Sequence, residues 1–207
     1  LSDTTDGIFN LNLPDIDNFI RKEIPHGFAV RNKALTKYAD INDLICLRDL
    51  KNHHKFNLAL GTLGGGNHFI EINQGQYGKY LVVHSGSRNL GLQVANYYQQ
   101  RAYEYHNGID DKFEQEKMEI IKTYKQQNKK QDIRNAIEEL KKKHKKTNFI
   151  PKPLCYLEGQ LMKDYLHDMK IMQDYALVNR DIMASSILVF LQKYQIEDAF
   201  HTIHNYI

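Results

Sequence analysis

The sequence contains little cysteine and no long apolar run. Its two cysteines, Cys46 and Cys155, cannot form a disulfide framework, and neither belongs to a CxxC pair of the kind that binds metals. We therefore expect a reducing, cytoplasmic setting. No stretch approaches the roughly 18 apolar residues of a membrane span, and the most apolar window, residues 185–191, is far shorter. The first residues also lack a basic segment followed by an apolar one, so no signal peptide is predicted.

The composition is that of a folded globular protein. Hydrophobic residues make up 42% and charged residues 26% of the 207 positions, which excludes a fully disordered chain and a collagen-like repeat. The chain begins without methionine and ends directly after a short apolar stretch. We therefore expect a central piece of a longer protein, with residues 1–207 belonging to a single domain.

The order of the elements predicts an α+β fold. Residues 1–60 mix short apolar runs with turn signals, and residues 40–50 favour one short helix. Strands are expected at 68–72 and 80–84, joined as an antiparallel hairpin. Helical periodicity follows over residues 90–107, over 110–144 with a break near Asn128, and over 161–191. Residues 199–207 are expected to be extended.

The first informative motif is the glycine-rich stretch at residues 61–71, Gly-Thr-Leu-Gly-Gly-Gly-Asn-His-Phe-Ile-Glu. Consecutive glycines let the backbone approach a ligand closely. Side chains alternate along a strand, so His68 is expected on one face with Ile70, and Asn67, Phe69 and Glu71 on the other. This polar cluster suits metal and nucleotide binding, but it also fits a glycine hairpin with a hydrogen-bonded histidine.

The second motif, residues 83–91, reads Val-His-Ser-Gly-Ser-Arg-Asn-Leu-Gly. It places His84 at the end of a strand and Arg88 at the start of a helix, where backbone amides and a guanidinium favour a phosphate. His68 and His84 could converge on one metal ion such as Mn, Zn or Fe. Without the first motif, a serine-rich helix cap with an exposed arginine would explain these residues.

Both motifs resemble those of the RtcB family of tRNA-splicing RNA ligases. Further segments resemble that family in the same order along nearly the whole chain: Ile24-Pro25-His26-Gly27, Ala176-Leu177-Val178-Asn179-Arg180 and Ile203-His204-Asn205. The resemblance implies an RtcB-like fold built around the glycine-rich hairpin.

The resemblance also implies an activity and its cofactors. The family uses GTP and Mn²⁺, expected as two ions, to join RNA ending in a 2′,3′-cyclic phosphate or 3′-phosphate to RNA with a 5′-hydroxyl, through a guanylylated histidine. Such ligases act in tRNA splicing or RNA repair, and many are activated by an archease-type protein. The implied roles are metal ligands for His68, His84 and His204; GTP contacts for Asn67, His68, Phe69, Glu71, His204 and Asn205; and an RNA phosphate contact for Arg88.

Two features depart from the family. Its Asp-x-Gly-Cys-Gly segment has no counterpart here, because Cys46 lies in Leu-Ile-Cys-Leu and Cys155 lies downstream of the motifs. The guanylylated histidine is expected beyond this chain, so we expect no catalytic nucleophile here and no complete reaction by these residues alone. Two other interpretations stay open: a non-catalytic RNA- or nucleotide-binding paralogue, and a metal-dependent phosphoesterase.

A basic helical segment at about residues 110–148 is the other candidate site. Residues 122–146 contain ten Lys or Arg and three acidic residues, so the rest of the chain carries a net negative charge. The segment could be a solvated helical face whose apolar positions pack on the protein. Alternatively, Lys141, Lys142 and Lys143 could bind the RNA backbone in a salt-dependent manner.

Overall fold

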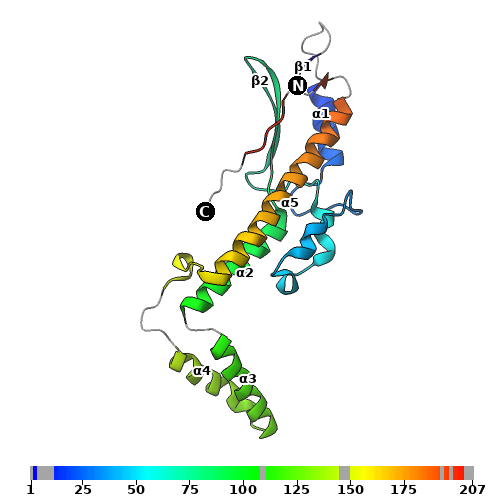
Figure 1. Ribbon diagram of the computed structural model, residues 1–207. Coiled ribbons are helices and arrows are strands. Elements are labelled where there is room, and N and C mark those ends of the chain that lie inside the picture. The colour runs from blue at the N-terminus through cyan, green and yellow to red at the C-terminus, as the bar shows by residue number, and fades with distance from the viewer. Residues whose placement is uncertain are drawn as a thin grey trace. The chain divides into compact units, whose positions relative to one another are not determined.

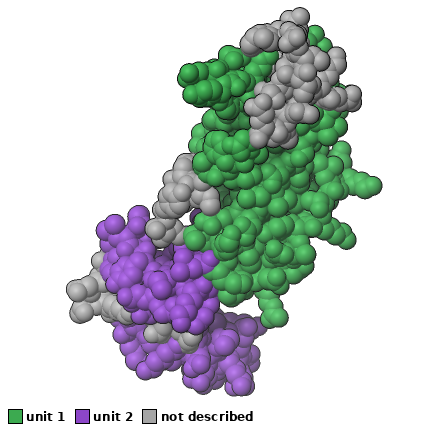
Figure 2. Space-filling model, turned by 45° about the horizontal axis from the view of Figure 1, so that its top comes forward, with its two compact units in different colours: residues 1–93, 167–207 green, residues 94–166 purple. Residues whose placement is uncertain are grey.

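The computed structural model describes residues 2–3, 12–107, 111–144, 150–191, 194–195 and 198–202. The described residues combine helices with two antiparallel strand pairs (Figure 1), which confirms the predicted α+β class. They divide into two compact units, residues 1–93 with 167–207 and residues 94–166 (Figure 2). No helix in the described ranges is both long enough and apolar enough to cross a membrane.

The central strand pair is the predicted hairpin, and it is longer than expected. Strands β2 (Phe69–Gly75) and β3 (Gly78–His84) pair antiparallel, with Phe69 opposite His84 and Gly75 opposite Gly78. A Cβ at position 75 would lie 2.5 Å from the Tyr80 ring, so a side chain there would require this exposed ring to move. The first strand begins at Phe69, so His68 precedes the strand and is not part of it.

Helix α1 (Leu13–Glu23) was not predicted. Its signals are present in the sequence: Asn12 caps the first turn by accepting a hydrogen bond from the Asp15 amide at 3.4 Å, and Pro14 stands at the helix start. The helix lies along the C-terminal part of α5 (Gly159–Leu191) (Figure 1). The Phe19 and Phe190 rings stack there with their centroids 4.3 Å apart.

One hydrophobic cluster of the first unit lies between α1, α5 and one face of the hairpin. It is formed by buried Ile16, Ile24, Met183, Ile187 and Leu191, against which partly buried Ile70, Ile72, Leu81 and Val83 pack. The hairpin therefore buries one face and exposes the face that carries Phe69 and Glu71. The predicted alternation of Ile70 against Phe69 and Glu71 is confirmed.

The remaining helices follow the predicted periodicity. They are α2 (Arg88–His106), α3 (Asp111–Gln126) and α4 (Ile133–His144), besides α5. The predicted break near Asn128 is confirmed: this residue has a φ of +57°, the left-handed conformation that ends a helix. A 3₁₀ turn, η5 (Lys130–Asp132), leads into α4.

Short elements complete the chain. The helix expected at 40–50 is present as two 3₁₀ turns, η1 (Ala39–Asp43) and η2 (Leu47–Asp49). Three more 3₁₀ turns are η3 (His53–Lys55), η4 (Asn57–Ala59) and η6 (Lys152–Leu154). The second strand pair joins β1 (Ser2–Asp3) to β4 (Tyr194–Gln195). Residues 198–202 have no regular structure, and the remainder of the predicted extended end, 203–207, lies outside the described residues.

Candidate functional site

The glycine-rich loop of residues 61–67, called the glycine loop below, brings two chemically important side chains together. Gly64 has a φ of +96°, which L residues rarely adopt. A Cβ at this position would clash with both the His68 imidazole and the Arg88 guanidinium. Glycine is therefore required at position 64 because two side chains occupy the space that any other residue would need.

Asn179, buried in the middle of α5, holds both glycine motifs in place. Its Oδ1 accepts hydrogen bonds from the amides of Gly61 (2.8 Å) and Thr62 (3.1 Å). Its Nδ2 donates to the Thr62 carbonyl (3.2 Å), the Ser85 hydroxyl (3.1 Å) and the Gly86 carbonyl (3.1 Å). One side chain thus joins the start of the glycine loop to the end of β3.

Neighbouring side chains reinforce the same connection. Arg180 donates to the Ser85 carbonyl at 3.1 Å, and the Ser85 hydroxyl donates to the Leu63 carbonyl at 2.8 Å. Asn179 and Arg180 resemble a family motif in the sequence, but the sequence alone indicates no role for them. The available signal was a run of polar residues, Asn179-Arg180-Asp181, directly after the apolar run Ala176-Leu177-Val178.

His68 and His84, called the histidine pair below, lie at the open end of the hairpin. Their ring centroids are 6.0 Å apart, and the His84 ring stacks on Phe69 at 5.1 Å. The Nδ1 atom of His68 is buried and has no hydrogen-bond partner in the described part of the chain. Burial, followed by the charges of Arg88 and His84, lowers the pKa of His68 below its usual value. The environment therefore favours a neutral imidazole, which is the form that binds metals.

Arg88 lies beside the histidine pair and is already engaged by the protein. Its Nε donates to the Thr62 hydroxyl at 2.9 Å and one Nη donates to the Gly27 carbonyl at 2.8 Å. Burial lowers its pKa, and its backbone has a φ of +59° at the start of α2. Such strain is found at sites where the surrounding structure dictates the geometry. The RNA phosphate contact expected of Arg88 stays a prediction.

Asn67, Phe69 and Glu71, three of the residues expected to bind GTP, lie next to His68 or within three residues of it along the chain. Asn67, Phe69 and Glu71 are exposed, and a Glu71 carboxylate oxygen accepts a hydrogen bond from Asn73 at 2.8 Å. His204 and Asn205, expected to contact the metal and GTP, lie outside the described residues.

The described ranges contain no group of three His, Cys, Asp or Glu residues placed to hold a metal ion together. Cys46 is fully buried, and burial together with a hydrogen bond to Asp168 raises the pKa of its thiol. A thiol kept protonated in this way is a poor metal ligand. The histidine pair is thus the part of a metal site that the described residues can supply.

The predicted RNA-binding lysines lie on another part of the chain. Lys141, Lys142 and Lys143 are exposed in the last turn of α4, within the second unit. Lys143 also lies 3.4 Å from Glu116 of α3, which His144 contacts at 3.2 Å. The hydrogen bond from His144, with a smaller contribution from Lys143, lowers the pKa of Glu116.

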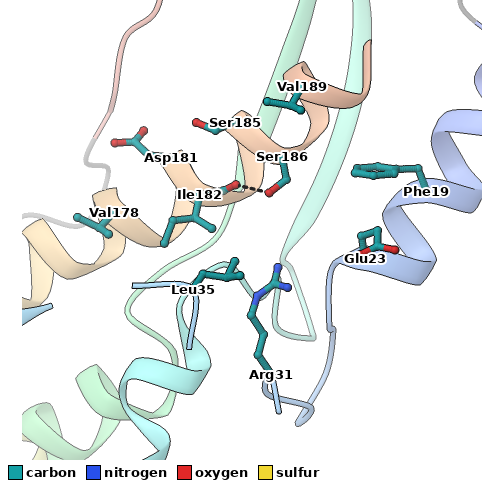
Figure 3. A pocket seen from close by; sticks show the side chains of 10 residues that line it. All are labelled: Phe19, Glu23, Arg31, Leu35, Val178, Asp181, Ile182, Ser185, Ser186 and Val189. Atoms are coloured by element: carbon teal, nitrogen blue, oxygen red, sulfur yellow. Dashed lines mark hydrogen bonds between the residues drawn. The ribbon is translucent and has the colours of Figure 1, made fainter. Parts of the chain in front are cut away.

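A pocket of about 590 Å³ lies between α1 and α5 in the first unit (Figure 3). Its lining is Phe19, Glu23, Arg31, Leu35, Val178, Asp181, Ile182, Ser185, Ser186 and Val189. Arg31 connects this pocket to the glycine loop by donating to the Leu60 carbonyl at 3.3 Å and the Gly61 carbonyl at 2.7 Å. Because the predicted metal, GTP and RNA residues are not part of its lining, we place the candidate site at the histidine pair.

Comparison with protein families agrees with the resemblance of the motifs. The family model described as tRNA-splicing ligase RtcB matches residues 31–207. No match was found among curated proteins or among solved structures. The matched range includes the glycine loop, the histidine pair, Arg88 and Asn179, which are the residues that the fold brings together. The chain therefore belongs to the RtcB family of tRNA-splicing RNA ligases.

Proposed function

We propose that this chain supplies part of the metal and GTP site of an RNA ligase that joins 2′,3′-cyclic phosphate or 3′-phosphate ends to 5′-hydroxyl ends. Membership of the RtcB family supports RNA as the substrate. We assign the guanylylated histidine to none of these 207 residues, so ligation is proposed for the protein that contains this chain. An archease-type activating protein stays a prediction from the family.

The observation that carries the proposal is the histidine pair. A buried imidazole nitrogen without a partner is costly unless something else binds it, and the second ring lies 6.0 Å from the first. We propose that His68 and His84 hold Mn²⁺, together with His204. The ion, when bound, would supply a Lewis acid that neutralises phosphate charge.

The proposed GTP contacts follow from the exposed face of the hairpin. Phe69 is 41% exposed, although its ring stacks on His84. Glu71 and Asn67 lie on the solvent-accessible side as well, where polar side chains can reach a nucleotide. We propose that these residues, with Asn205, bind GTP beside the metal.

Removing both histidines is expected to weaken manganese binding strongly. By titration calorimetry the 207-residue chain should bind Mn²⁺ with a dissociation constant in the micromolar range, and the His68→Ala, His84→Ala variant should bind it more than about tenfold more weakly. The physical reason is that, among the described residues, the imidazole nitrogens of His68 and His84 are the atoms proposed to bind the metal ion.

The matched control is the His53→Ala, His54→Ala variant, which removes two exposed histidines of η3. It should bind manganese like the unmodified chain. Equal binding by the His68→Ala, His84→Ala variant and the control would contradict the proposed metal site.

We further propose that the lysines at the end of α4 bind the RNA backbone. Reversing Lys141, Lys142 and Lys143 to glutamate is expected to weaken RNA binding roughly tenfold at low salt, and to lower the slope of log affinity against log salt by about 2. Fluorescence anisotropy of a labelled single-stranded RNA at several salt concentrations measures both quantities.

A variant with the same change in net charge separates a local contact from long-range attraction. Lys33, Lys37 and Lys55 are exposed and belong to the first unit. Reversal of these three should affect affinity much less. If both triple variants lose the same affinity, the segment is a solvated surface and the proposed contact is wrong.

A further inference from the structure

The turn formed by residues 25–29, called the Pro25–Ala29 turn below, is fastened to the glycine loop. The Leu63 amide donates to the Pro25 carbonyl at 2.8 Å, and the Gly27 amide donates to the Gly64 carbonyl at 2.7 Å. Gly27 has a φ of +63°, so a residue with a side chain would be strained there. The position of the turn is therefore determined by the loop that precedes His68.

Arg88 adds a third connection, and it places the turn next to the histidine pair. Its guanidinium donates to the Gly27 carbonyl at 2.8 Å. The guanidinium and the His68 ring both lie against Gly64, where a Cβ would clash with each of them. Phe28 follows Gly27 directly and is 107% exposed, the largest exposure among the apolar side chains described. The fully exposed ring of Phe28 thus belongs to the residue directly after Gly27, whose carbonyl oxygen accepts a hydrogen bond from Arg88.

The second most exposed aromatic side chain among the described residues, Tyr77, does not share this setting. Tyr77, 83% exposed, lies in the turn of the hairpin between Gly75 and Gly78, at the end opposite His84. Scattered exposed apolar residues are ordinary features of protein surfaces. Phe28 differs because hydrogen bonds hold its turn against the proposed site for RNA ends and GTP.

We propose that Phe28 stacks on a nucleobase of the ligand bound at the histidine pair. Every nucleobase has a flat π face, and exposed aromatic rings beside a phosphate-binding site are the usual platform for such bases. A turn held in place loses little conformational entropy when a base stacks on it. The inference rests on the proposed function, because it needs a nucleic acid or nucleotide at this site.

The base could belong to the RNA strand or to GTP, and a fluorescence experiment distinguishes the two. The chain contains no tryptophan, so a Phe28→Trp variant has a single tryptophan reporter. Stacking should quench its emission. Titration with a short single-stranded RNA carrying a 2′,3′-cyclic phosphate, and separately with GTP, shows which ligand provides the base. The same RNA with abasic nucleotides at its 3′ end should bind without quenching.

Affinity provides the second measurement. Anisotropy of the labelled ligand should show about tenfold weaker binding to Phe28→Ala, and normal binding to Phe28→Tyr, which keeps the ring. Tyr77→Trp and Tyr77→Ala are the matched controls, and neither quenching nor a loss of affinity is expected for them.

The outcomes separate this inference from the function on which it rests. Ligand binding without quenching at position 28, with unchanged affinity of Phe28→Ala, would overturn the stacking and leave the proposed function intact. Failure of the unmodified chain to bind either RNA or GTP would overturn both.

Discussion

Replacing Asn179 with alanine is expected to lower the free energy of unfolding by about 3 to 4 kcal/mol. The fully buried amide makes five hydrogen bonds, and its removal leaves the amides of Gly61 and Thr62 without their acceptor. Urea denaturation of both proteins measures the difference. Because Asn179 also joins the glycine loop to the end of β3, manganese binding should weaken even under conditions in which the variant is folded.

The control for this prediction lies on the same helix. The Ser186 hydroxyl donates to the Ile182 carbonyl one turn earlier in α5, a bond within a single helix, so Ser186→Ala should change stability by about 0.5 kcal/mol or less. A loss from Asn179→Ala no larger than that from Ser186→Ala would show that the two motifs are held together by other contacts.

Replacing Gly64 with alanine is expected to damage both stability and metal binding. The φ of +96° strains any residue with a side chain, and the added Cβ would collide with His68 and Arg88. Together these effects should cost about 3 kcal/mol. Displacement of the His68 ring should weaken manganese binding about tenfold or more, which calorimetry measures.

Gly66 provides a closely matched comparison, because it lies in the same loop with a φ of +72° but has nothing within 4 Å of the position of a Cβ. Gly66→Ala should therefore cost only the backbone strain, about 1 kcal/mol, and leave manganese binding unchanged. If the two variants lose the same stability and the same metal affinity, then the crowding of His68 and Arg88 at Gly64 has no functional consequence.

Local patterns predicted much of the secondary structure. Helical periodicity located α2, α3, α4 and α5, and the crowded polar residues near Asn128 marked the break. These elements are predictable because each depends on residues close in sequence. Helix α1 was missed because its apolar positions, Ile16, Phe19 and Ile20, lie among acidic and basic residues in a segment rich in turn signals.

The position of His68 shows the limit of such patterns. Strict alternation would place His68 on the same face of the hairpin as Ile70, and on the other face from Phe69. His84 is the cross-strand partner of Phe69, so alternation would separate the two histidines. The two histidines lie near each other because β2 begins only at Phe69 and glycines with positive φ turn the preceding backbone. Strand alternation does not apply to a residue outside the strand.

The sequence by itself determined the α+β class, the hairpin and the family, because these depend on local periodicity and on short motifs that can be recognised in order. Only the tertiary structure decided that Asn179, more than ninety residues after His84, bonds to both motifs, and that the Pro25–Ala29 turn is fastened beside them. Such contacts depend on how a distant helix packs against two loops, and the formation of buried hydrogen bonds between them leaves no periodic trace in the sequence.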